Sequence, residues 1–384
     1  MYRIPNLTEL TELIPKRIKR QPMRMDVIPR IHSYLPTLTD KNIRNIVHNY
    51  LSDDVNLNSK TKSQYGNISN WDVSNVTDMN RLFKNYENFN ENISSWNVSN
   101  VTNMKSMFNG AKDFNQPLNN WDVSNVINMR YMFLGATSFN QPLNNWDVSN
   151  VTSMTCMFHR TIEYNQPLNN WDVSHVTNMR DMFKHAKSFN QPLNNWNVSN
   201  VKDMWGMFYN ATKFNQPLNN WNVTNVTDMS QMFNAAFKFN QPLNNWNVSN
   251  VTNMYDMFYI AKSFNQPLNN WNVFNVTNMK YMFCDAYNFD QSLNNWNVSN
   301  VTDMRYMFNR AINFNQPLNN WNVSNVTDFE GMFNSADTFN EALFTLQPGN
   351  NATSLRGMFY HADQFDQNLD HWTVASSVDI SNYI

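Results

Sequence analysis

A single motif recurs along this chain with a period of 25 residues. A clear copy, Phe-Asn-Gln-Pro-Leu-Asn-Asn-Trp-Asp-Val-Ser-Asn-Val, runs from Phe114 to Val126. Its tryptophan recurs without a slip at Trp71, Trp96, Trp121, Trp146, Trp171, Trp196, Trp221, Trp246, Trp271, Trp296 and Trp321. A fixed period between about 20 and 50 residues is the signature of a solenoid, in which each unit covers the apolar face of its neighbour. The repeat therefore predicts the architecture and leaves the function open.

Each repeat divides into two segments that differ in apolar spacing. In the first, Leu118-x-x-Trp121-x-Val123 places Trp121 and Val123 on one face of an extended segment. The second has the spacing of a helical stripe, with apolar residues at Val126, Met129, Met132, Phe133 and Ala136. We therefore predict an α/β fold: a single-stack, leucine-rich-repeat-like solenoid of about thirteen 25-residue coils, each a short strand plus a short helix.

Three aromatic columns and one asparagine column are expected to form the framework. The predicted structural residues are Trp121, Phe133, Phe139, Trp146, Trp171 and Asn125. Burying one aromatic side chain removes roughly 150–250 Å² from water, about 4–6 kcal/mol gross. The Asn125 column, broken only at His175, is expected to pair its amide with backbone groups at a turn. Thr102 and its equivalents are the expected caps of the short helices.

The N-terminal end of the array is expected to carry a capping helix, because an open solenoid end exposes apolar core. Residues 39–51 have amphipathic helical spacing, with Thr39 as the expected N-cap, and residues 52–64 are predicted to be a polar linker. The expected organisation is a basic, proline-punctuated arm (1–37), a cap helix with linker (38–64), the repeat solenoid (65–378) and a C-terminal tail (379–384).

Charge is distributed unevenly between the two ends. Residues 1–50 contain nine Lys and Arg against four Asp and Glu, so their net charge is +5. Because the whole chain has a net charge of −2, the remaining residues have a net charge of −7. The basic arm contains the cluster Lys16, Arg17, Lys19 and Arg20. That cluster could be a nuclear-import or phosphate-contacting patch, but a solvated arm is the interpretation we adopt. The acidic array is not expected to bind nucleic acid.

The termini and the cysteines bear on the compartment. The first 25 residues lack the apolar core of a secretory signal, and no lipobox is present, so we expect an intracellular or virion-associated protein. There is no run of 18 apolar residues, so no membrane span is expected. Cys156 and Cys284 lie about five coils apart, beyond the roughly 7 Å reach of a disulfide, so free thiols are expected.

The repeat resembles the BspA-like leucine-rich repeat family, in the 25-residue form of mycoplasma surface lipoproteins and giant-virus paralogues. The matching string is Phe-Asn-Gln-Pro-Leu-Asn-Asn-Trp-Asp-Val-Ser-Asn-Val-Thr-x-Met-x-x-Met-Phe-x-x-Ala, and it covers about residues 65–378. The resemblance implies a solenoid fold and a role in adhesion or host interaction. The chain departs from the bacterial pattern in lacking a signal and lipobox, and its Asn-rich style is closer to the viral members.

The sequence contains no catalytic constellation. The motifs GxGxxG, GxxxxGK[ST], HExxH and GxSxG are all absent, so we expect no enzyme and no cofactor. The densest group of potential metal ligands is Cys156, His159, His175 and His185. Cys156 and His159 could supply two ligands to a metal. We interpret them as variable surface positions and, at His175, as one substituted position of the asparagine column, and therefore expect no metal site.

The variable positions on either side of each Met-Phe pair carry the strongest functional hint. On the helix model they point away from the core, and aromatic and Arg side chains at exposed sites are those that interfaces favour. The candidate partner-binding residues are Arg130, Tyr131, Trp205, Tyr209, Tyr255, Tyr259, Tyr281, Arg305 and Tyr306. The predicted function is a non-enzymatic, adhesion-type scaffold that binds an unidentified protein. The alternative is a structural or virion component that self-associates, and the sequence leaves the oligomeric state open.

Overall fold

The computed structural model describes residues 37–346 and 351–382. The chain divides into two units, Met1–Pro36 and Thr37–Ile384, and the description concerns the second. Residues 1–36 of the predicted basic arm, with Lys16, Arg17, Lys19 and Arg20, lie outside the described residues.

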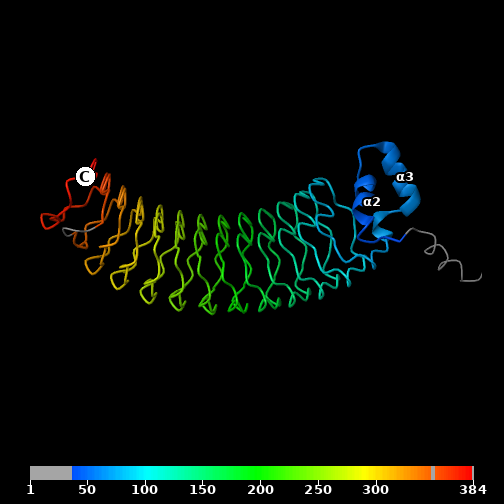
Figure 1. Ribbon diagram of the computed structural model, residues 1–384, viewed down its shortest axis with the longest axis horizontal. Coiled ribbons are helices and arrows are strands. Elements are labelled where there is room, and N and C mark those ends of the chain that lie inside the picture. Colours follow the sequence, from blue (N-terminus) through cyan, green and yellow to red (C-terminus); the bar gives the residue numbers. More distant parts are fainter. Residues whose placement is uncertain (1–36, 347–350, 383–384) are drawn as a thin grey trace, which may run out of the picture. The chain divides into compact units, whose positions relative to one another are not determined.

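Helices are found only at the start of the described chain (Figure 1), as α2 (Ile43–Tyr50), α3 (Val55–Tyr65) and the 3-10 turn η2 (Ile68–Asn70). Helix α2 falls inside the predicted capping helix, although it begins four residues after Thr39. Helix α3 occupies the segment predicted to be a linker, because Asp54 caps it by accepting hydrogen bonds from the first-turn amides. Among the described residues, no helix is long and apolar enough to span a membrane.

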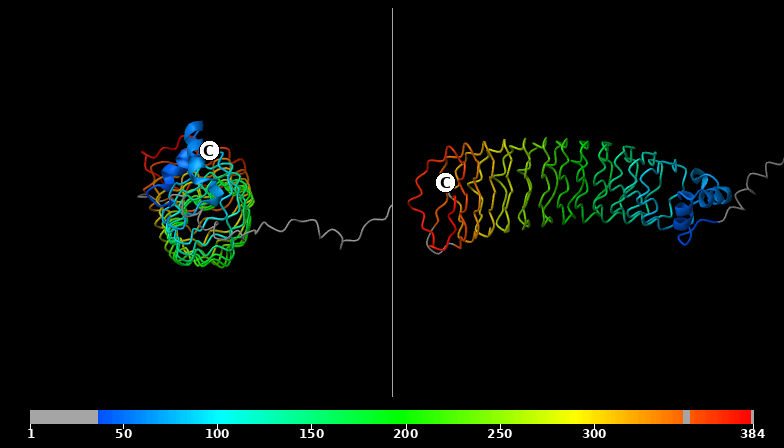
Figure 2. Two further views of the ribbon diagram at one scale, coloured as in Figure 1. Left: turned by 90° about the vertical axis from the view of Figure 1, so that its right-hand side faces the viewer. Right: turned by 90° about the horizontal axis from the view of Figure 1, so that it is seen from above.

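The rest of the described chain is a repeat solenoid whose coils lie side by side in chain order (Figures 1 and 2). Parallel bridges join each coil to the next at one recurring position. The bridged residues are Asp78, Asn103, Asn128, Ser153, Asn178, Asp203, Asp228, Asn253, Asn278, Asp303, Asp328, Ser354 and Asp379. The spacing is 25 residues except at the last bridge but one, from Asp328 to Ser354, where it is 26.

The expected strand and helix in each coil are not found: across the described coils the backbone forms turns and isolated bridges. The second segment shows why it is not helical. The amides of Tyr131, Phe133 and Gly135 donate to carbonyls of the following coil at 2.8–2.9 Å, and the amides between them close turns to the third residue back. An α-helix needs every amide to bond to the fourth residue back. The α/β assignment is therefore wrong at the level of the coil.

We call the second segment of each coil, which consists of two consecutive turns, the tandem turn. Left-handed backbone conformations make its two turns possible. Tyr131 and Gly135 have φ of 60° and 71°, and the same two positions have positive φ in the next coil at Cys156 and Arg160. Non-glycine residues in this region cost of order 1 kcal/mol each, which the hydrogen bonds between coils offset. Because the turn recurs after four residues, it directs side chains inward with nearly the spacing of a helix. That coincidence explains the incorrect prediction.

Polar side chains bind neighbouring coils together at the turns. The hydroxyl of Thr177 donates to the carbonyl of Thr152, so the threonine column links coils and caps no helix. Capping of the tandem turn comes from the next column, where Asn178 Oδ1 accepts from the amide of Arg180. The side chain of Asn125 donates to the carbonyl of Ser99, 2.8 Å away, which satisfies a backbone acceptor that no turn uses.

The core fills the inside of the coils with stacked rings. Trp146 and Trp171 are 2% and 3% exposed, with ring centroids 6.5 Å apart and planes inclined by 1°. The indole of Trp146 donates to the carbonyl of Leu118 in the preceding coil, which satisfies its only donor. Phe133 lies 4.2 Å from Phe139 in its own coil and also stacks on the phenylalanines of both neighbouring coils. Trp121 is 4% exposed and belongs to the same core.

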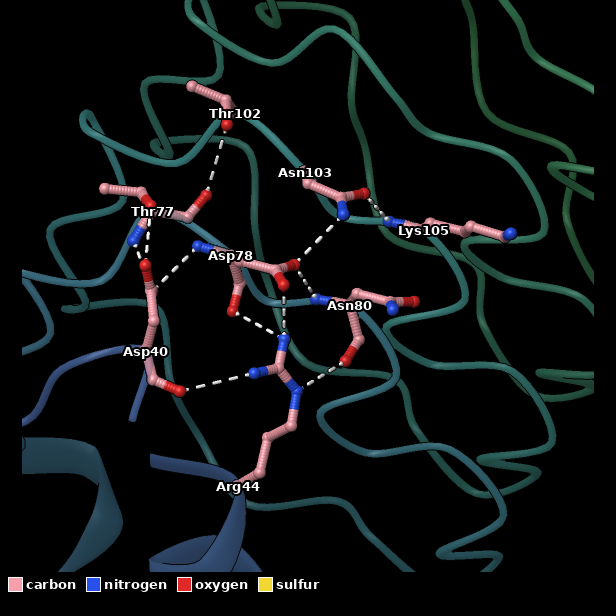
Figure 3. Close-up of polar contacts among 8 residues, drawn as sticks. All are labelled: Asp40, Arg44, Thr77, Asp78, Asn80, Thr102, Asn103 and Lys105. Atoms are coloured by element: carbon pink, nitrogen blue, oxygen red, sulfur yellow. Dashed lines mark hydrogen bonds and ion pairs between the residues drawn. The ribbon is translucent and has the colours of Figure 1, made fainter. Parts of the chain in front are cut away.

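Two charged side chains close the N-terminal end of the solenoid (Figure 3). Arg44 of α2 donates to the carbonyls of Asp78 and Asn80, which have no preceding coil to accept from. Asp40 accepts from the amides of Thr77 and Asp78 and from the Thr77 hydroxyl. A cation therefore meets the carbonyl edge and a carboxylate meets the amide edge, which is the arrangement that stabilises helix ends.

Candidate interaction surface

The candidate surface is formed by the outward side chains of the tandem turns. In the coil of Phe133, Arg130 is exposed and Tyr131 is half-buried. The Arg130 guanidinium lies 5.7 Å from the Tyr131 ring centroid. Positive φ at Tyr131 turns its side chain outward, while Met132 and Phe133 remain inside the coil. In later coils, these two positions and the two that follow the Met-Phe pair build two clusters, and neither cluster includes Arg130 or Tyr131.

The first cluster, the tryptophan cluster, consists of Arg180, Lys184, His185, Trp205 and Tyr209. Arg180 lies 4.1 Å from the Trp205 ring centroid, and the Lys184 ammonium lies 4.6 Å from the centroids of both Trp205 and Tyr209. The His185 ring meets the Tyr209 ring edge-on at 5.2 Å. Trp205 and Tyr209, which are four residues apart, thus share one face, and tandem turns and not a helix bring them together. Both rings are half-buried.

The second cluster, the tyrosine ladder, consists of Tyr255, Tyr259, Tyr281 and Tyr306. Tyr281 meets Tyr255 and Tyr259 edge-on at 6.3 and 6.0 Å, and it stacks on Tyr306 at 5.0 Å. All four rings are half-buried, so each leaves an edge or face in solvent. The ladder therefore forms one aromatic strip across three successive coils.

Charges of both signs border the tyrosine ladder. Arg305 forms an ion pair with Asp303 at 2.6 Å and approaches Asp328 at 3.7 Å. Burial raises the pKa of Asp256 to about 6, and hydrogen bonds from Gln231 and Tyr255 act against that rise. Burial also raises the pKa of Tyr255 to about 12, with the Asp256 carboxylate adding to the effect. The Tyr255 hydroxyl therefore stays protonated at physiological pH and can donate a hydrogen bond.

A hollow of about 180 Å³ continues the ladder towards the C-terminal coils. It is lined by Tyr306, Glu330, Gly331, Asn334, Arg356, Gly357, Tyr360 and Asn382. A larger hollow of about 780 Å³ lies where the cap meets the first coils, and its lining includes Leu51, Tyr86 and Phe89 beside Glu87 and Glu91. The first hollow extends an aromatic surface, whereas the second is an acidic depression.

Sequence reasoning missed the charged side chains that hold the aromatic rings. Lys184 occupies the position equivalent to Tyr209 one coil earlier, so the 25-residue period places the two side by side. The role of Asp256 could not be recognised, because this residue directly follows Tyr255 at a position that varies from coil to coil. The period was the signal that could have found both, if each variable position had been compared with its equivalents in the adjacent coils.

The comparisons with known proteins bear on the repeat as a whole. The family described as Mycoplasma protein of unknown function, DUF285, matches residues 55–166, 142–238, 218–311 and 291–384. The chain belongs to this family. The DUF285 matches begin within α3 and extend through the solenoid. The mycoplasma relationship expected from the repeat is therefore shown, whereas the BspA-like name is not part of the family's description.

Other comparisons add little about the DUF285 chain. One solved structure that it resembles is the crystal structure of the TLR13-ssRNA13 complex, with 11% sequence identity and a TM-score of 0.24. The match covers 80% of this chain and 44% of that chain, so it spans less than half of its neighbour. A likeness this weak supports no argument about the ligand. No curated protein matches.

Proposed function

We propose that this DUF285 chain is a non-enzymatic scaffold that binds a protein partner through the tyrosine ladder and the tryptophan cluster. The observation that carries the proposal is the ladder itself, in which Tyr255, Tyr259, Tyr281 and Tyr306 form a continuous, half-buried strip. The solenoid core does not need these rings, because its own aromatic columns are complete inside the coils.

The chemistry of the strip favours a protein partner. Tyrosine and tryptophan provide rigid, amphipathic contact area, and interfaces are enriched in them and in arginine. The rings are already held by neighbouring coils, so a partner orders few side chains when it binds. The ladder is bordered by Lys280 and Arg305 and also by Asp303 and Glu330, and this mixture of charges suits a protein surface better than a polyanion.

Finer features of the proposal rest on the repeat alone. We count about thirteen 25-residue coils from the repeated positions of the sequence. The Asn-rich style of the repeat supports a viral affiliation, with a host protein as the adhesion-type partner. The absence of a catalytic motif in the sequence supports the non-enzymatic assignment.

The experiment compares partner capture by the ladder with capture by a matched tyrosine. We expect the Tyr281→Ala, Tyr306→Ala double variant to lose at least tenfold in partner recovery while its melting temperature stays nearly unchanged. Tyr131→Ala is the matched control, because Tyr131 occupies the same position of the coil away from the ladder. Recovery is measured by affinity capture with quantitative mass spectrometry.

The tryptophan cluster is tested in the same assay. Trp205→Ala with Tyr209→Ala removes both rings that hold Lys184 and should also reduce recovery of the same partner. Equal recovery by wild type and both double variants would contradict the proposal. Concentration-dependent self-association of the purified chain without any partner, seen by sedimentation velocity, would favour the structural alternative.

A further inference from the structure

We propose that Cys156, His159 and Asp181 form a zinc-binding site between two adjacent coils. The three side chains each bring one donor atom, and these atoms lie within 4.8 Å of one another. Cys156 is 7% exposed and Asp181 is 8% exposed, so the donors lie beneath the surface. Thiolate, imidazole and carboxylate are the three ligand types that Zn²⁺ takes in proteins.

The donors at this site have fewer or longer contacts than buried polar atoms normally have. In residues 37–346 and 351–382, His159 Nδ1 is one of the buried side-chain atoms that have no hydrogen-bond partner. Asp181 Oδ1 accepts no hydrogen bond of normal geometry either, and it is paired with the Lys184 ammonium at 3.3 Å. The thiol of Cys156 makes only a long contact of 3.9 Å to Asp181 Oδ2. Buried polar atoms without hydrogen bonds are rare, so an unpaired imidazole nitrogen beside a buried thiol and a buried carboxylate points to a ligand.

The solenoid positions the donors rigidly and leaves room for them. Cys156 and Asp181 occupy the same left-handed position in successive coils, each with φ of 54°, and hydrogen bonds between coils fix both backbones. The next coil has Gly206 at that position, where an added Cβ would lie 2.6 Å from Asp181 Oδ1. Glycine thus keeps open the space that the carboxylate uses. Tetrahedral zinc holds its ligands about 3.5 Å apart, and the Cys156 sulfur already lies 3.9 Å from Asp181 Oδ2.

A lysine competes for the same carboxylate in the metal-free protein. The Lys184 ammonium lies 3.3 Å from Asp181 Oδ1, and it also faces the rings of Trp205 and Tyr209. When zinc binds, Lys184 keeps its contacts with the rings and releases the carboxylate. The site is therefore sensitive to the charge at position 184. The sequence could not indicate this donor set, because Asp181 reaches the other two only through the stacking of coils.

Cobalt and zinc titrations of the full chain test the site. Co²⁺ should give the near-ultraviolet charge-transfer band of a thiolate–cobalt bond, and Zn²⁺ should displace it. Cys156→Ser should abolish the band, and His159→Asn should weaken Zn²⁺ binding more than tenfold by calorimetry. Cys284→Ser is the matched control, because Cys284 is also a buried free thiol in the tandem turn, and it should retain the band.

A second variant keeps the proposal falsifiable if a ligand variant folds poorly. Lys184→Met removes the competing ammonium and keeps the aliphatic stem, so it should bind Zn²⁺ severalfold more tightly than wild type. A wild-type protein without the thiolate band would overturn the proposal. So would a Cys156→Ser variant that retains the band, or a Lys184→Met variant that binds Zn²⁺ more weakly.

Discussion

At the scale of the residue, inward side chains and outward side chains obey different constraints. Phe133 touches rings of its own coil and of both neighbours, so every change there disturbs three coils. Leu134, the next residue, is half-buried and can vary. The division explains why some columns repeat without exception while adjacent ones change from coil to coil.

Phe133→Ala should lower the free energy of unfolding by about 3–5 kcal/mol, because it leaves a ring-sized cavity inside a stack. Leu134→Ala is the neighbouring control and should cost less than about 1 kcal/mol. Chemical denaturation followed by tryptophan fluorescence measures both. Equal destabilisation by the two variants would show that the stack is not the core.

A buried carboxyl gives the surface a pH dependence. Burial raises the pKa of Asp256 to about 6, against about 3.9 in an unfolded chain. Between about pH 4 and 6 the unfolded chain releases this proton while the folded chain keeps it. Folding stability from this group therefore falls as pH rises through that window, and it stays lower above it.

Asp256→Asn cannot ionise, so it should be more stable than wild type at pH 8 by about 1 kcal/mol, after allowance for solvent screening. The difference from this source should disappear below about pH 4, where Asp256 is protonated in both states. Thermal melts of both proteins at pH 4 and pH 8 provide the comparison. A difference that is the same at both pH values would exclude the effect.

At the scale of the element, the tandem turn is the unit whose backbone the sequence pattern predicted wrongly, as a short helix. Its apolar residues Met129, Met132, Phe133 and Ala136 point inward, as a helical stripe would, so the inward set could be read from the sequence. Its backbone could not, because the amides of Tyr131 and Phe133 bond to the following coil. The same holds for the N-terminal cap. The amphipathic face of α2 could be predicted from the sequence, whereas the contacts of Arg44 with the carbonyls of Asp78 and Asn80 could not.

Arg44→Met keeps the aliphatic stem of Arg44 and removes the donors that close the carbonyl edge. It should lower stability by about 1–2 kcal/mol and increase hydrogen exchange in the first coil, because two carbonyls lose a donor and Asp78 loses its ion pair. Lys41→Met, at an exposed position beside α2, is the control. Hydrogen exchange with mass spectrometry locates the effect. Indistinguishable exchange in the two variants would mean that Arg44 is not part of the cap.

At the scale of the whole solenoid, each coil contacts mainly its neighbours, so stability is close to a sum over coils and their interfaces. The bridges recur at equivalent positions, and the aromatic stacks run through the same coils. Removing one full period should therefore bring equivalent positions back into register. Removing a fraction of a period should not.

Deletion of residues 215–239 removes one period outside the ladder and outside the zinc donors. The shortened chain should fold with a melting temperature within about 5 °C of wild type. Deletion of residues 215–234 removes 20 residues and should unfold the coils on either side, because their inward positions no longer align. Circular dichroism and thermal melts distinguish the two. A cooperative, native-like melt of the 20-residue deletion would contradict the register argument.

The sequence by itself determined the period, the inward columns and the face that varies. Side-chain burial repeats with the motif, so buried positions hold the same apolar residue types in each coil and outward positions do not. Only the tertiary structure decided the backbone of the coil and the neighbours across coils. Alternate amides of each tandem turn donate to residues about 25 positions away, and positive φ sets where each outward side chain points. Asp181 meets Cys156, and Lys184 meets Trp205, for that reason alone.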